Sequence, residues 1–133
     1  MFRMSILAIC VAMIGICVAE SAVAADKTVR LGRVYYRMVC TSCHKDTAGE
    51  TISPSSRTKA EWEAYLGADA HDASGKSNPK VSYYTSTAFR DSVKDTNKAA
   101  KKFLKMPEDQ LQDALNAFIA FGAKDSDNPQ RCK

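Results

Sequence analysis

The stretch Cys40-Thr41-Ser42-Cys43-His44 decides how this sequence is interpreted. On one helical turn, two cysteine sulfurs can reach the two vinyl groups of a haem, and the next residue then directs its imidazole at the iron. A C-x-x-C pair also occurs in thiol redox sites, which need a βαβ context, and as half of a zinc site, which needs four ligands. The sequence shows no βαβ pattern and no second pair of zinc ligands. The motif therefore predicts one covalent haem c on Cys40 and Cys43, with His44 as the proximal iron ligand.

The residues around this motif predict a helix over 28–43, because apolar residues recur there at helical spacing. Gly32, Tyr36 and Cys40 are spaced by four and share one face of that helix, where the glycine lets another helix cross very close. Pro107 begins a last helix that is the natural partner for this crossing. The buried stripe predicted for this last helix consists of Leu111, Leu115, Phe118 and Ile119.

Between these two helices the sequence predicts loops and shorter helices, and no strands. Thr58-Lys59-Ala60-Glu61 is a capping box that opens a short helix, and Gly67 ends it. Asn78-Pro79 is a cap with proline at the first helical position, and a short helical turn is expected over 98–105. The polar tail, 125–133, is expected to be loosely held. The predicted fold class is therefore all-α, in a single domain.

Residues 1–25 are typical of a secretory signal peptide. Arg3 supplies the positive start, 6–18 is an apolar run, and small residues precede Asp26. The apolar run is shorter than the roughly 20 residues that a membrane span needs, and an uncleaved N-terminal anchor is the alternative. We therefore expect a mature domain over 26–133 that is periplasmic or otherwise exported and does not span a membrane.

The charge and cysteine content limit the partners. The 133 residues carry a formal net charge of +4, which two haem propionates would roughly halve. Aromatic residues are not interleaved with the basic ones as a nucleic-acid stacking surface requires, so no nucleic-acid partner is expected. The mature chain keeps one cysteine besides the motif, Cys132. It is interpreted as a tail thiol, as the link of a disulfide-linked dimer, or as an iron ligand.

With these features the chain resembles class I cytochromes c. In that family an N-terminal helix carries a glycine, an aromatic residue and C-x-x-C-H at this spacing, and a C-terminal helix with leucine and an aromatic residue crosses it at the glycine. The resemblance implies the cytochrome c fold and electron transfer without enzymatic activity. The family also has a proline whose carbonyl accepts a hydrogen bond from the proximal histidine. Pro54 is the matching candidate for His44, and a plain loop proline is the alternative.

The sixth iron ligand departs from the family pattern of a methionine well before the last helix. Met38 lies inside the predicted helix over 28–43, two residues before Cys40, and cannot reach the opposite face of the haem. Met106 directly precedes Pro107, where it resembles a hydrophobic staple that packs on Leu111. His71 is the other histidine of the chain and lies in a loop. His71 is therefore the favoured sixth ligand and Met106 the alternative, with an open iron as the third option.

A second resemblance supports His71. Some small bacterial monohaem cytochromes have a tryptophan followed nine residues later by a histidine, and end in an A-x-D-S-D-x-P-x-x-C-like tail. Trp62, His71 and the segment 123–132 match that arrangement. Trp62 is expected in the core or against the haem edge, where its indole N–H would donate to a propionate.

The predicted function is one-electron transfer between redox partners. The alternatives are a haem-based gas sensor or catalyst with an open iron, and a subunit of a conducting assembly linked through Cys132. One set of basic residues recurs at intervals of three or four and would either dock an acidic redox partner or only face solvent. This set consists of Arg90, Lys94, Lys98, Lys101 and Lys105.

Overall fold

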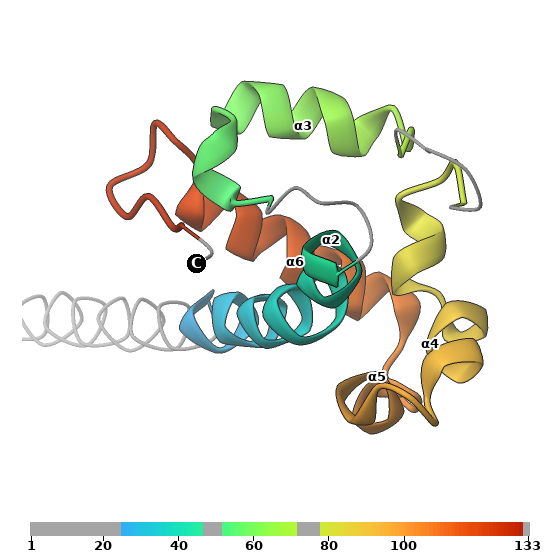
Figure 1. Cartoon of the computed structure of the whole chain (residues 1–133). Coiled ribbons are helices and arrows are strands. Elements are labelled where there is room, and N and C mark those ends of the chain that lie inside the picture. Colours follow the sequence, from blue (N-terminus) through green and yellow to red (C-terminus); the bar gives the residue numbers. More distant parts are fainter. Residues whose placement is uncertain (1–24, 47–51, 72–77, 132–133) are drawn as a thin grey trace, which may run out of the picture.

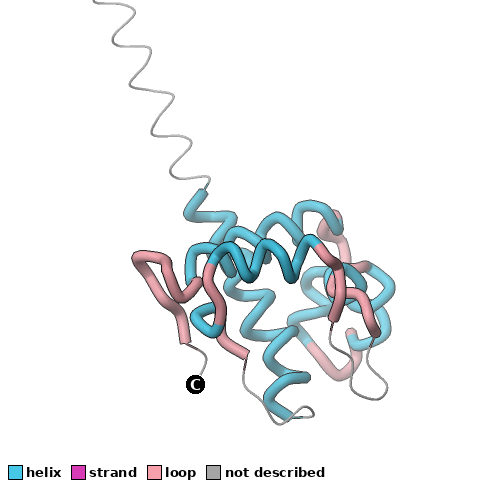
Figure 2. The backbone as a smooth tube through the Cα atoms, turned by 90° about the horizontal axis from the view of Figure 1, so that it is seen from above, coloured by secondary structure: helices cyan, strands magenta, loops and turns pink. Residues whose placement is uncertain are grey.

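The computed structural model describes residues 25–46, 52–71 and 78–131. Those residues form helices joined by loops and turns and contain no strand (Figure 2). This confirms the predicted all-α class. Residues 1–24 of the predicted signal peptide, and Cys132, lie outside the described residues. Within the described ranges, no helix is long and apolar enough to cross a membrane.

The N-terminal helical segment covers 25–46 without a break. It is an α-helix over 25–35, then the π-helical segment η1 (Tyr36–Cys40), then α2 (Thr41–Asp46). Figure 1 shows α3 along one side of α6, and α4 and α5 gathered at the beginning of α6. The remaining elements are η2 (Pro54–Ser56), α3 (Lys59–Gly67), η3 (Ser82–Thr85), α4 (Thr87–Val93), α5 (Lys98–Phe103) and α6 (Glu108–Gly122).

The N-terminal helix crosses α6 at Gly32, as predicted from the sequence. A Cβ atom built on Gly32 would lie 2.5 Å from the carbonyl carbon of Ala114 and 2.9 Å from Cβ of Phe118. Only a residue without a side chain allows the two backbones to approach this closely. The predicted stripe on α6 is buried, with Leu111 fully enclosed and Phe118 only 2% exposed.

Two apolar clusters flank this crossing. The Trp62 cluster joins the N-terminal helix to α3 and α6, and the Phe103 cluster joins it to α5 and α6. Cys40 packs against both clusters, so the first cysteine of the motif lies where they meet. The buried members of the Trp62 cluster are Tyr36, Trp62, Leu115, Phe118, Ile119 and Ala123, and those of the Phe103 cluster are Tyr35, Val39, Ala100, Phe103 and Leu111.

Helix α3 begins as its sequence predicts. The Thr58 hydroxyl accepts from the backbone N–H of Glu61 at 3.3 Å, and the Glu61 carboxylate accepts from the backbone N–H of Thr58 at 2.7 Å. This reciprocal capping box lowers the pKa of Glu61, first through the backbone hydrogen bond. Gly67 is the last residue of the helix.

The prediction of a loosely held tail is wrong for the part that the structure describes. The backbone N–H of Gln130 donates to the carbonyl of Gly122 at 2.9 Å, and the Gln130 carbonyl accepts from the N–H of Ser55 at 3.1 Å. The Asp125 carboxylate accepts from the N–H of Lys59 at 2.8 Å, which adds a second cap to α3. The tail therefore fastens α3 and η2 to the end of α6.

The helix predicted from Asn78-Pro79 is replaced by a 3₁₀ turn and a later helix. Segment η3 covers Ser82–Thr85, and α4 starts afresh at Thr87. The Ser86 hydroxyl caps α4 by accepting from the N–H of Phe89 at 3.1 Å. A serine that can bond to the backbone in this way favours a helix start over a helix interior.

Candidate cofactor site

The C-x-x-C-H motif begins on a π-helical turn. The backbone N–H of Thr41 donates to the carbonyl of Tyr36, which is the i→i+5 bond of such a turn. The hydroxyl of Thr41 donates to the Arg37 carbonyl at 2.6 Å, and that of Ser42 to the Val39 carbonyl at 2.7 Å. The two residues between the cysteines thus bond back to their own helix. Single π turns occur often at functional sites.

The two cysteines differ in exposure. Cys40 is half-buried where the two apolar clusters meet, Cys43 is exposed, and His44 is half-buried. The sulfurs therefore lie at the edge of the core, where one side of an attached group would face apolar residues and the other solvent.

The structure brings His44 and His71 together from separate parts of the chain. Their ring centres are 5.8 Å apart, and the ring planes meet at 66°. Burial lowers the pKa of His44, and the charge of His71 lowers it further. A lowered pKa keeps the imidazole neutral near neutral pH, which is the form that binds metals. Two facing imidazoles can hold one metal ion between them.

Defined contacts hold the end of the loop that carries His71. The backbone N–H of His71 donates to the carbonyl of Pro79 at 2.7 Å. Asp69 has φ of 47°, a left-handed conformation that aspartate tolerates better than most residues. Its carboxylate accepts from the backbone N–H and from the hydroxyl of Ser82, both at 2.7 Å, and these bonds lower the pKa of Asp69. The chain on the N-terminal side of His71 is therefore fastened to η3.

Tyr84 of η3 packs against His71, with ring centres 4.7 Å apart and an angle of 42° between the planes. Neither Tyr84 nor Asp69 was predicted from the sequence as a neighbour of the site. An aspartate in a loop and the serine that begins η3 were the available signals, but their partnership is not visible without the fold.

The structure places Met106 in a packing role. Its side chain packs against the Phe103 cluster, which contains Leu111, in agreement with the predicted staple. Its carbonyl accepts from Nη1 of Arg90 at 3.0 Å.

Pro54 is buried near the end of α6, and its carbonyl accepts from the indole N–H of Trp62 at 2.6 Å. An indole has one N–H, so this bond takes the place of the predicted donation from Trp62 to a propionate. Acceptance from His44 by the same carbonyl stays a prediction. Trp62 itself is buried, as expected.

The predicted basic set does not form one surface. Arg90 is fully buried, and its guanidinium donates to the carbonyls of Phe103 and Met106. Lys94 pairs with Asp91 at 2.8 Å. Of the five residues, Lys98, Lys101 and Lys105 are exposed.

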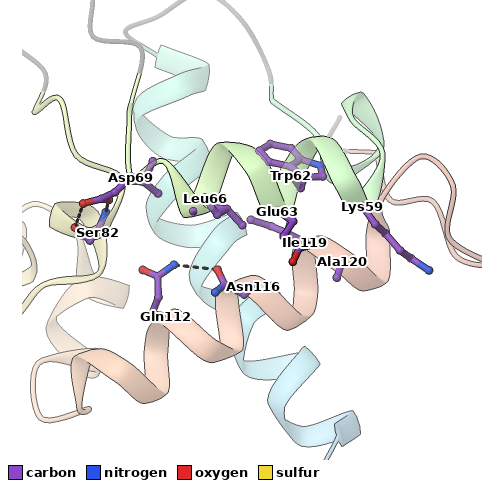
Figure 3. Close-up of a pocket in the computed structure, with 12 residues that line it drawn as sticks. Lys59, Trp62, Glu63, Leu66, Asp69, Ser82, Gln112, Asn116, Ile119 and Ala120 are labelled. Atoms are coloured by element: carbon purple, nitrogen blue, oxygen red, sulfur yellow. Dashed lines mark hydrogen bonds between the residues drawn. The ribbon is translucent and has the colours of Figure 1, made fainter.

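A cleft of about 610 Å³ lies between α3 and α6 (Figure 3). Trp62 and Leu66 reach into it from α3, and Asn116 and Ile119 from α6. Neither the motif residues nor His71 line this cleft, but Asp69 and Ser82, which hold the chain before His71, lie at its edge.

Among the described residues, no group of three or more histidine, cysteine, aspartate or glutamate side chains could hold a metal ion. The motif histidine and His71 form a pair of adjacent imidazoles within this part of the chain. Comparison with known proteins gives no match to any family model, curated protein or solved structure. The functional interpretation therefore rests on the chain's own residues.

Proposed function

We propose that this protein is an exported class I c-type cytochrome, a one-electron carrier with a single covalent haem c. The observation that carries the proposal is the facing pair of His44 and His71, with the C-x-x-C cysteines on the turn before His44. The close crossing of the N-terminal helix and α6 at Gly32 supports the cytochrome c fold.

The distance between the two imidazoles fits a shared metal. Metal–imidazole bonds are about 2.0 Å long and the bonding nitrogen lies roughly 1.2 Å from its ring centre, so two imidazoles on opposite sides of one ion have centres about 6.4 Å apart. The observed 5.8 Å differs from that value by about 0.6 Å. His44 and His71 come from different segments of the chain, and both imidazoles could hold one bound metal.

Each residue of the site then has a role. The thiols of Cys40 and Cys43 attach the haem, His44 is the proximal ligand and His71 the sixth ligand. The bound haem supplies an iron that gains and loses one electron. The two histidines fix its coordination, while the apolar clusters around Cys40 keep water from that side.

With both histidines holding the iron, no position would be left open for a gas or a substrate, which favours an electron carrier over a gas sensor or an enzyme with an open iron. Two histidines also give a lower reduction potential than a histidine with a methionine. The partners would be redox proteins, with Lys98 and Lys101 of α5 available for an acidic one. Export rests on the predicted signal peptide, and a dimer or assembly linked through Cys132 stays a proposal.

Replacing either motif cysteine by alanine tests the proposal. Cys40→Ala and Cys43→Ala should each abolish normal two-point attachment, which changes the haem stain on denaturing gels and the pyridine haemochrome spectrum. Ser42→Ala, on the same turn, removes only the bond to the Val39 carbonyl and should leave both signals unchanged. If both cysteine variants keep the wild-type stain and spectrum, the protein is not a c-type cytochrome.

The sixth ligand is tested by a second pair of variants. His71→Ala should produce a high-spin protein that binds carbon monoxide when reduced. Met106→Leu should leave the spectrum nearly unchanged, because Met106 packs in the Phe103 cluster. The oxidised wild type should also lack the weak far-red absorption of iron–methionine ligation. If Met106→Leu opens the iron and His71→Ala does not, Met106 is the ligand and the usual family pattern holds.

A further inference from the structure

Tyr84 connects His71 to the helix that carries His44. Its ring packs on the His71 ring at 4.7 Å, and the His71 ring in turn faces His44 at 5.8 Å. Its backbone carbonyl accepts a hydrogen bond from the hydroxyl of Tyr35, 49 residues earlier in the chain. Tyr35 is fully buried and directly precedes the π-helical segment before the motif. Tyr84, which packs against His71, is therefore tied to the N-terminal helix at the residue before its π-helical segment.

Further contacts fix the Tyr84 ring. Its hydroxyl accepts from the backbone N–H of Asn78 at 2.8 Å and lies 3.3 Å from the Asn78 carbonyl, to which it donates. The ring of Phe89 in α4 also packs against the Tyr84 ring, with ring centres 5.0 Å apart and planes at 69°. The Tyr84 ring is therefore held by hydrogen bonds at its hydroxyl and by edge contacts with the rings of Phe89 and Tyr83, and it packs on the His71 imidazole in this position.

We infer that Tyr84 is a positioning residue for the sixth ligand: its ring holds the His71 imidazole facing His44. This inference rests on the proposed function, in which His71 binds the haem iron. A histidine at the end of a loop would otherwise sample several rotamers, and only part of that population would face the iron. A ligand held in place before it binds loses less conformational freedom on binding, and this raises the fraction bound.

The test compares three variants of the haem-loaded protein. Tyr84→Leu removes the ring against His71 but keeps an apolar side chain. Tyr84→Phe keeps the ring and loses the two hydroxyl contacts to Asn78. Tyr83→Leu is the matched control, because Tyr83 neighbours Tyr84 in η3 and its ring contacts are with Tyr84 and Phe89.

The measurement is the fraction of reduced protein in which His71 is dissociated, taken from the rate of carbon monoxide binding. An aromatic pair contributes enough to change that fraction roughly two- to twelvefold, and this is the increase expected for Tyr84→Leu. The rate for Tyr84→Phe should stay within about twofold of the wild-type rate, because the aromatic ring that packs on His71 is kept. Tyr83→Leu should also remain near wild type. Far-UV circular dichroism confirms that each variant is folded.

Equal rates for Tyr84→Leu and wild type would overturn the inference, as would equal increases for Tyr84→Leu and Tyr83→Leu. Failure of the proposed function gives a different result. If His71→Ala does not open the iron, His71 is not the ligand; if the cysteine variants keep normal haem attachment, the cytochrome assignment itself is wrong. If Tyr84→Phe raises the rate as much as Tyr84→Leu does, the loss of the Asn78 contacts is the cause of the effect, and ring packing is rejected as its cause.

Discussion

Replacing Gly32 by alanine should destabilise the fold at the crossing of its first and last helices. The added Cβ would lie 2.5 Å from the carbonyl carbon of Ala114, and closer still to its oxygen, whereas ordinary contact starts at 3.4 Å. The neighbour is backbone of another helix, so no side-chain rotation can relieve the overlap. The helices must separate by about an ångström, and this loosens the packing of Phe118 on the same face.

Two opposing effects set the magnitude. Overpacking a well-packed core costs typically 1–3 kcal/mol and occasionally more, and a contact with backbone belongs at the upper end of about 3 kcal/mol. Alanine is favoured over glycine inside a helix by about 1 kcal/mol, which offsets part of the loss. The net loss of unfolding free energy is about 2 kcal/mol. For a domain of this size that corresponds to a fall in Tm of roughly 10 °C.

The assay is thermal and urea unfolding of the purified protein, followed by far-UV circular dichroism. Gly67→Ala is the matched control, because a Cβ at Gly67 meets nothing within 4 Å and the residue ends α3. It should be neutral or stabilising by up to about 1 kcal/mol. If Gly32→Ala is as stable as Gly67→Ala, the close crossing described at Ala114 is not present in the protein.

Two further predictions concern the basic residues. Arg90→Met should cost about 3 kcal/mol in urea unfolding, because it removes the charged hydrogen bonds from the buried guanidinium to the carbonyls of Phe103 and Met106, and an unaltered midpoint would mean that these bonds are not formed. Lys98→Gln with Lys101→Gln should slow electron transfer to an acidic redox protein and weaken its dependence on salt. Lys59→Gln with Lys124→Gln makes the same charge change on other elements, so equal effects of the two pairs would point to net charge alone.

The parts of the fold that the sequence predicted correctly depend on local signals. The capping box at Thr58 involves residues three apart, and both of its hydrogen bonds form. Helix α6 follows from one proline and an apolar stripe with helical spacing. The crossing at Gly32 was predictable because a glycine on a buried face has few explanations other than close approach.

The parts that were missed depend on contacts between distant segments. A π turn adds one residue to a helix without any signature in the spacing of Gly32, Tyr36 and Cys40. Arg90 matched a surface pattern, yet it is buried, and its guanidinium donates to the carbonyls of Phe103 at the end of α5 and of Met106 before α6. The tail looked unrestrained because its partners at Ser55 and Lys59 lie far away in the sequence.

The sixth ligand shows why the sequence alone left two candidates. Met106 and His71 could each bind an iron chemically. Met106 precedes Pro107 and His71 lies in a loop, and neither setting predicts from the sequence where the side chain points. The direction comes from long-range contacts: Asp69 with Ser82, and Tyr84 with Tyr35. These contacts place His71 against the Tyr84 ring and beside His44, while Met106 is partly buried and packs against the apolar cluster around Phe103. To bind an iron beside His44, as we propose for His71, Met106 would have to leave its contacts with that cluster, whereas the His71 ring already lies next to the His44 ring.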